Sequence, residues 1–436
     1  MKKINTVIYN LIVDDGLGDI LFGFKLAKYL HTNYPDMEIT LVTRDEFNTK
    51  CKTLLKNSLQ DGIQYSTIDQ YEFEKDYASD PDFLIIGPVF SFDSDDVHQI
   101  TKNGESEIIL IGEYDLSKNE YERTAERLSR YGLKVSATIR TGLSGLGIFF
   151  DEWLMNPLFT TTPKDLTITA KTLMGENETF RRYLSKTNIS VNYSHDNAKK
   201  VIHIHTSLCC GDKNTDLIMM GENAKKDLLI LYQLANSLIE KGYSRVIYHE
   251  PNKIPSVLAQ NDSNGPQYRL IHTGKVSFAE ARALRKLSTG ILTGATGDQS
   301  YSEAISVNPL VIYECRSWKS DLYNEMVKIA NSIDESGRLS SVIKELGSTS
   351  NSLSSSSDSD SSASESDESS SDSEDNIISK LRSPDIIRNL KMYQQHILQK
   401  NDLEKNISTH QPGFFKRKRD TVLNEAESDL KKARVV

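Results

Sequence analysis

Short apolar runs and apolar residues at helical spacing alternate along the first part of the chain. Between the first two runs, Ile20, Phe24, Ala27 and Leu30 recur at the spacing of a helix face, and the polar turn at 33–35 ends that helix. A strand, a helix and a strand within about 40 residues predict a βαβ unit and a parallel sheet. The expected strands of this region lie at 4–13, 38–42, 83–86, 108–111 and 133–136.

The same alternation starts again after a polar stretch at 192–197. Helical segments at 228–240 and 278–287 separate short runs typical of buried strands. We therefore predict an α/β fold with two Rossmann-like domains facing a cleft (GT-B-like), at 1–195 and 196–346. The strands expected in the second domain lie at 200–206, 245–249, 269–272, 290–293 and 310–313.

The composition changes after about residue 347. Residues 354–375 are almost entirely Ser, Asp and Glu, with eight acidic and no basic residues. Such a segment buries too little apolar surface to offset its loss of conformational entropy, so we predict a disordered linker at 347–376. A solvated spacer is the simplest interpretation, although its serines also suit acidophilic kinases. The tail at 377–436 is expected to be helical at first, either packed back or as a separate module, and basic at its end.

Charge and composition narrow the class of protein. The formal net charge of -9 argues against general nucleic-acid binding, and a 38% apolar content reflects the polar tail. Four cysteines do not suggest a disulfide framework, and the adjacent Cys209 and Cys210 lack zinc-site spacing. No apolar run reaches the roughly 18–20 residues that span a bilayer. We expect a soluble intracellular protein.

Two basic clusters, Lys416–Arg419 and Lys431–Arg434, stand eleven residues apart near the C-terminus. This separation suits a bipartite signal bound by a nuclear import receptor. A plain solvated tail and a contact with an anionic surface are the alternatives. Together with the acidic linker, the clusters fit a protein acting inside a eukaryotic cell, including a bacterial effector that reaches a host cell or its nucleus.

The loop DDGLGD at 14–19 lies between the first strand and the first helix. Ligands bind α/β domains at this end of the strands. A carboxylate there can remove a proton from an acceptor, while glycines let a substrate approach the backbone. Asp19 and Asp15 are therefore candidate catalytic residues, and Gly16 and Gly18 are candidates for substrate binding. A helix N-cap at Asp19 and a turn at Asp15 are the structural alternatives.

A second glycine-containing loop follows the strand expected at 290–293. The spacing Ser300-x-x-Glu303 predicts a capping box at the start of a helix, where free amides and the helix dipole suit a phosphate. Because the loop lacks the lysine of a P-loop, it is a poor candidate for the site of a nucleoside triphosphatase. It is better suited to hold the diphosphate of a nucleotide-sugar. The substrate-binding candidates here are Gly294, Gly297, Asp298, Gln299, Ser300 and Glu303.

Three of the candidates have open alternatives. Glu303 contacts a ribose or only closes the capping box, and Asp298 orients the sugar or only neutralises the loop. His205, at the end of the strand expected at 200–206, is a candidate for a contact with the diphosphate. A histidine at a strand end also serves as an ordinary core residue.

The two loops together resemble those of known families. DGLGDIL at 15–21, followed by YPDMEITLV at 34–42, is similar to the amino terminus of the lipopolysaccharide heptosyltransferases, which are two-domain GT-B glycosyltransferases. That resemblance places their catalytic base on Asp19. The loop is also similar to that of the protein-arginine rhamnosyltransferases, whose paired aspartates fall on Asp15 and Asp19. The segment at 293–304 resembles the donor-diphosphate loop of both families, with Asp298 in the place of an acidic residue.

The resemblance covers residues 1–45 and about 200–320. It implies that a hexosyl, heptosyl or deoxyhexosyl group is transferred from a nucleotide-sugar to an acceptor, and this acceptor could be a protein. The transfer would be inverting and independent of a metal, with no further cofactor. The sequence at 21–24 departs from the threonine-rich continuation of the heptosyltransferases, so acceptor identity does not carry over. The loop at 140–147 has no match, and either a substrate contact or a structural turn fits it. The alternative function is a catalytically silent scaffold that binds a nucleotide or a partner and carries a regulatory tail.

Overall fold

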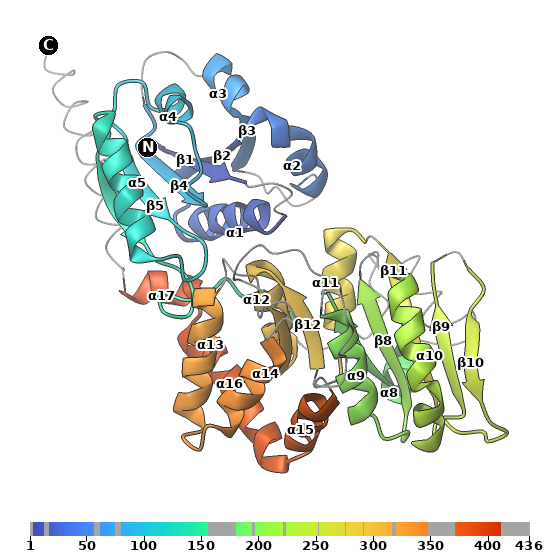
Figure 1. Cartoon of the computed structure of the whole chain (residues 1–436). Coiled ribbons are helices and arrows are strands. Elements are labelled where there is room, and N and C mark those ends of the chain that lie inside the picture. The colour runs from blue at the N-terminus through green and yellow to red at the C-terminus, as the bar shows by residue number, and fades with distance from the viewer. Residues whose placement is uncertain are drawn as a thin grey trace, which may run out of the picture. The chain divides into compact units, whose positions relative to one another are not determined.

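The computed structural model describes residues 3–12, 17–55, 62–74, 80–155, 180–193, 197–220, 224–251, 253–274, 276–290, 292–315, 320–347 and 371–410. The chain forms two compact units (Figure 1). Unit 1 consists of Met1–Phe149 and Gln399–Val436, and unit 2 of Phe150–Leu398. Each unit is built on its own sheet.

The sheet of unit 1 is parallel in all its described pairings. Its strands are β1 (Ile4–Leu11), β2 (Met37–Thr43), β3 (Ile63–Thr67), β4 (Phe83–Pro88), β5 (Glu107–Ile111) and β6 (Val135–Ile139). Their order is β3-β2-β1-β4-β5-β6, so the direction of winding reverses between β1 and β4. In such sheets ligands bind outside the carboxyl ends of the strands at this switch point.

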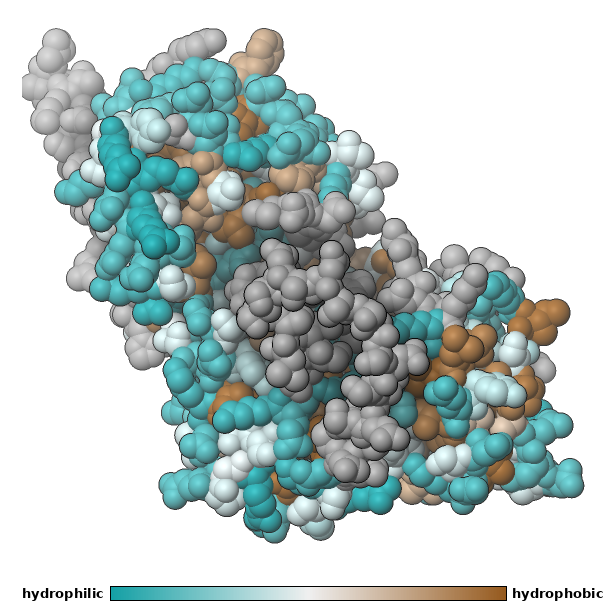
Figure 2. Space-filling model, viewed as in Figure 1, coloured by the Kyte–Doolittle hydropathy of each residue, from teal (hydrophilic) through white to brown (hydrophobic). Residues whose placement is uncertain are grey.

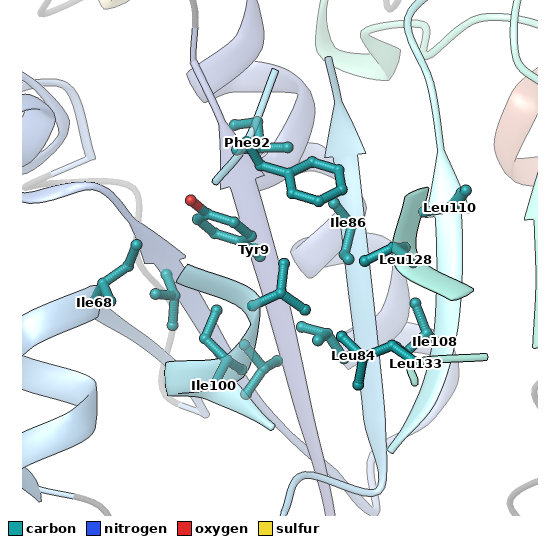
Figure 3. Packing of buried hydrophobic residues seen from close by; sticks show 14 of the residues in the cluster. Tyr9, Ile68, Leu84, Ile86, Phe92, Ile100, Ile108, Leu110, Leu128 and Leu133 are labelled. Carbon is teal, nitrogen blue, oxygen red and sulfur yellow. The ribbon is translucent and has the colours of Figure 1, made fainter. Parts of the chain in front are cut away.

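Helices cover both faces of this sheet. They are α1 (Leu17–Asn33), α2 (Asn48–Leu55), α3 (Ile68–Glu74), α4 (Ser94–Ile100), α5 (Lys118–Arg130) and α17 (Leu403–His410), with a 3-10 turn η1 at Asp45–Phe47. Figure 3 shows the core on the face covered by α4 and α5, where Tyr9, Leu84 and Ile86 of the central strands meet Ile100 and Leu128. The central strands are buried on both faces, which explains why they are continuous apolar runs in the sequence.

The sheet of unit 2 has the order β10-β9-β11-β8-β7-β12-β13, with only β10 antiparallel among the described strands. Its strands are β7 (Thr187–Asn192), β8 (Asn214–Met220), β9 (Arg245–His249), β10 (Ser256–Gln260), β11 (Gln267–Gly274), β12 (Leu292–Thr296) and β13 (Leu310–Glu314). Its helices are α6 (Glu152–Met155), α8 (Phe180–Lys186), α9 (Ala198–Leu208), α10 (Ala224–Glu240), α11 (Phe278–Lys286), α12 (Asp298–Val307), α13 (Ser320–Ile333), α14 (Arg338–Gly347), α15 (Ser371–Leu381) and α16 (Pro384–Lys400). The winding reverses between β7 and β12.

The predicted fold class, two Rossmann-like α/β sheets, is confirmed, but one predicted strand is wrong. Residues 200–206 lie in helix α9, and the central strand is β7, which begins 13 residues earlier. Val201, Ile204 and His205 are buried at helical spacing, and a short apolar run does not separate the two structures by itself. The polar stretch at 192–197 is thus a β7–α9 connection, and the division at Phe150 differs from the boundary expected at 195.

The segment from Asn401 onward packs within unit 1 against the glycine-rich loop at 140–147. Asn401 Nδ2 donates to Leu143 O (3.0 Å), and Asn406 Nδ2 donates to Leu146 O (2.8 Å). A side chain at Gly147 would collide with the carbonyl oxygen of Asn401. The loop that had no match in the sequence comparison therefore forms a structural turn that receives the C-terminal segment.

One edge of the sheet of unit 2 exposes apolar side chains. Leu229 and Tyr232 on α10 and Ile254 and Val257 beside β10 are all at least half exposed, and Figure 2 shows apolar surface over α10, β9 and β10. The pairing of β10 with β9 is interrupted by a bulge between Val257 and Ala259. A bulge disturbs the regular ladder that another strand would need, so this edge is a poor template for strand addition.

Candidate active site

Asp19 lies in the first turn of α1, at the carboxyl edge of the sheet of unit 1. Helix α1 starts at Leu17, so Asp19 is its third residue and the N-cap interpretation is wrong. The Asp19 side chain is partly exposed. A carboxylate at a helix start next to the switch point of the sheet is positioned to meet a ligand. Gly18 lies in the same turn, while Asp15 and Gly16 are outside the described residues.

The second candidate loop runs from the end of β12 into α12. Gly297 is the N-cap of α12 with a φ of 79°, and a Cβ added there would meet no atom within 4 Å. Asp298, Gln299 and Ser300 form the first turn, where the backbone amides of a helix point outward from its end. An open glycine before a helix N-terminus is the arrangement that proteins use to bind phosphate.

The capping box predicted at Ser300 and Glu303 is wrong. Ser300 Oγ donates to the carbonyls of Thr296 and Gly297 instead. The helix starts at Asp298, because Gly297 adopts a backbone conformation that most residues avoid. Glu303 lies one turn further along and is buried, so its carboxylate serves another purpose.

That purpose is an ion pair with a buried arginine that the sequence analysis did not single out. Arg285 of α11 is 1% exposed, and its Nε lies 3.2 Å from Glu303 Oε2. Gln299 Nε2 donates to the other carboxylate oxygen at 2.7 Å. Burial lowers the pKa of the Arg285 guanidinium, while Glu303 and Tyr193 oppose that shift. The ion pair with Glu303 holds the Arg285 guanidinium against α12.

The remaining donor-side candidate from this loop has a packing role. Gly294 lies inside β12, and a Cβ there would collide with Asn192 of β7. Tyr193 N also donates to Gly294 O at 3.1 Å. This close approach holds the ends of β7 and β12 together, so that Tyr193 and the start of α12 share the switch point of the sheet.

His205 does not stand at a strand end. It lies in α9 and is buried, with its Nδ1 2.9 Å from Tyr268 Oη and 3.9 Å from Cys209 Sγ. Burial lowers its pKa to about 4, so the side chain is neutral at physiological pH. A neutral, enclosed imidazole suits a core residue better than a contact with a diphosphate.

Several other sequence-based predictions fall outside the described residues. These are residues 348–370 of the linker predicted as disordered at 347–376, and the basic clusters Lys416–Arg419 and Lys431–Arg434. The described ends of that predicted linker are helical instead, since Gly347 is the last residue of α14 and residues 371–376 lie in α15. Within the part of the chain that the structure describes, no three or more His, Cys, Asp or Glu side chains are grouped to hold a metal ion. Searched over the same residues, no helix has the length and apolar character needed to cross a membrane.

Comparison with known proteins gives structural but no sequence relatives. No protein-family profile and no curated protein sequence matches the chain. The structure is similar to a glycosyltransferase of Rickettsia africae ESF-5 (10% identity, 95% of this chain and 99% of that one, TM-score 0.45). It is also similar to an α,α-trehalose 6-phosphate synthase of Burkholderia multivorans (10%, 98% and 100%, 0.41) and to Anabaena HepE, solved with UDP and glucose (9%, 94% and 100%, 0.40).

Proposed function

We propose that the protein is a glycosyltransferase that moves a sugar from a nucleotide-sugar to an acceptor, by inverting and metal-independent chemistry. The observation that carries this proposal is the start of α12. It combines an open glycine N-cap, the first turn of a helix and the buried cation Arg285 at the switch point of a parallel sheet.

A nucleoside diphosphate fits this helix start by its charge and shape. The amides of Asp298, Gln299 and Ser300 would donate to phosphate oxygens, while Glu303 would keep the Arg285 guanidinium in place beside them. Arg285 Nη1 is buried without a hydrogen-bond partner among the described residues. Buried N–H groups are almost always satisfied, and an anion bound alongside would satisfy this one. The same groups would stabilise the diphosphate as the leaving group.

On the acceptor side, Asp19 would serve as the general base. As the acceptor oxygen or nitrogen attacks the anomeric carbon, its proton passes to the Asp19 carboxylate. The bond from the sugar to the diphosphate breaks, and its electron pair leaves with the nucleotide. The resemblance of the loop at 14–19 to two glycosyltransferase families supports this role, with Asp15 as an auxiliary. The protein acceptor and the nuclear import suggested by the tail belong to the same proposal.

Thermal-shift titration with UDP-, GDP- and dTDP-sugars tests the donor site. A ligand at about 100 times its Kd should raise the Tm by roughly 5 °C. Asp19→Asn should keep this shift while donor hydrolysis or transfer falls about 10²- to 10⁴-fold. Asp36→Asn, a change near the amino end of β2, is the matched control and should leave activity unchanged. A chain that no nucleotide stabilises would rule out the enzyme and leave the silent scaffold.

A further inference from the structure

A polar residue interrupts the apolar strand β1. Asn10 is 1% exposed, and neither its side-chain oxygen nor its side-chain nitrogen has a hydrogen-bond partner among the described residues. Buried amide groups are nearly always hydrogen-bonded, because water lost on folding must be replaced. An unsatisfied amide in the central strand therefore destabilises the fold and requires an explanation.

The amide of Asn10 faces α1. Side chains alternate along a strand, and the preceding residue Tyr9 packs into the core under α4 and α5 (Figure 3). A Cβ added to Gly23 of α1 would lie 2.2 Å from Asn10 Oδ1 and 2.4 Å from its Cγ. Gly23 is thus the residue of α1 that makes room for this amide.

Gly23 and Asp19 lie four residues apart in α1, on one face of the helix. Four residues correspond to a rise of about 6 Å. The Asn10 amide therefore lies about one helical turn below the residue proposed as the base. This rise separates the Cα atoms of Asp19 and Gly23 along the helix axis and exceeds a direct hydrogen bond, so a link between the two side chains would need a bridging water.

We propose that Asn10 is a positioning residue for Asp19, acting through one buried water that its amide holds below the carboxylate. This inference rests on the proposed function, in which Asp19 is the base. A buried polar group that weakens the fold and lies at a reactive edge is the kind of feature that is retained for activity at the expense of stability.

Asn10→Leu tests the proposal, because leucine has nearly the shape of asparagine and no polar atom. We expect a higher Tm than in the unaltered chain, a kcat about tenfold lower, and unchanged KM values for donor and acceptor. Asn10→Thr and Asn10→Val form a second, isosteric pair. The threonine can hold a water and should retain several-fold more activity than the valine. Unchanged kcat in Asn10→Leu, or equal kcat in the pair, would overturn the proposal.

Combination with Asp19→Asn shows whether Asn10 acts through Asp19. On that background Asn10→Leu should lower the residual rate no further, because the group it positions is gone. A tenfold loss on both backgrounds would show an independent, structural effect and reject the positioning role.

A readout without activity separates this inference from the proposed function. In asparagine-labelled full-length protein, the side-chain amide signal of Asn10, assigned through Asn10→Leu, should shift in Asp19→Asn and stay in place in Asp36→Asn. If the unaltered chain transfers no sugar and the signal still shifts, the proposed function fails and the link between Asn10 and Asp19 stands. A signal that does not respond to Asp19→Asn overturns the link.

Discussion

The starts of α1 and α12 follow one backbone plan and differ in what is buried beneath them. Each helix begins at the carboxyl edge of a parallel sheet, beside the strand where the winding reverses, and each has an aspartate in its first turn. At α12 the buried Arg285 of α11 pairs with Glu303 of α12 itself, whereas against α1 lies the neutral amide of Asn10.

This difference fits the two chemical tasks that we propose for the helix starts. An anion is held by a fixed cation together with helix amides, and the ion pair keeps that cation in place. A general base is a poorer proton acceptor when a nearby cation stabilises its charged form. A neutral amide beside the carboxylate lowers its basicity less than a cation would. Each task thus depends on one or two buried side chains rather than on the loop itself.

The largest effect is expected on the charged side. Glu303→Ala leaves the Arg285 guanidinium buried without its carboxylate, and removing one member of such a pair costs about 3–5 kcal/mol. Urea unfolding measures this loss. The double change Arg285→Met with Glu303→Leu should regain most of the stability, because an apolar pair tolerates burial. If the single change cost under about 1 kcal/mol, the pair would not be the rigid base of α12.

The next largest effect is expected from acid, which should destabilise unit 2 through His205. The folded pKa of His205, about 4, lies below the value near 6.5 of an unfolded histidine. Below pH 6.5 the unfolded chain binds a proton that the folded chain refuses, so stability present above pH 6.5 is lost as the pH falls towards 4. The loss amounts to about 3 kcal/mol and acts on unit 2. Hydrogen exchange between pH 7 and pH 4 measures it by segment, and His205→Gln should flatten the profile of α9 and β11.

The sequence predicted the sheets well because buried parallel strands are continuous apolar runs. It misplaced the start of the second sheet, because the spacing of Val201 and Ile204 fits a helix as well as a short strand. Asp19 and the loop at 297–300 could be located because glycine and acidic residues mark such turns. Arg285 could not, because its partner Glu303 is 18 residues away and only the packing of α11 on α12 brings them together. Asn10 was visible as a polar residue in an apolar run, but its position against Gly23 was not.

Substitution of Gly23 in α1 and of Gly297 before α12 shows whether side-chain packing or backbone conformation requires the glycine at each helix. Gly23→Ala places a methyl group against Asn10 and should cost roughly 1–3 kcal/mol, which Asn10→Ala in the same chain should largely restore. Gly297→Ala meets no neighbouring atom, but its φ of 79° should cost a similar amount that no second substitution restores. Chemical unfolding of the single and double variants decides between these causes. If Asn10→Ala also restored the free energy of unfolding of the Gly297→Ala variant, the assay would not report local packing.

The smallest effects concern helices α16 and α17, which contact α12 and α1, respectively. In unit 2, Tyr393 Oη of α16 lies 3.2 Å from Tyr301 Oη of α12, and in unit 1, Ser408 Oγ of α17 lies 2.9 Å from Tyr29 Oη of α1. Tyr393→Phe removes one hydrogen bond, whereas Ser408→Ala removes the one with Tyr29 and an exposed one to Glu404 O. Each change should cost about 0.5–1.5 kcal/mol. Because the Tyr301–Tyr393 pair is buried and Ser408 is exposed, the tyrosine change should cost more. Segment-resolved hydrogen exchange should show faster exchange in α12 for the first variant and in α1 for the second. If either variant accelerated hydrogen exchange equally in α1 and α12, then α16 and α17 would act on the whole chain rather than each on its own partner helix.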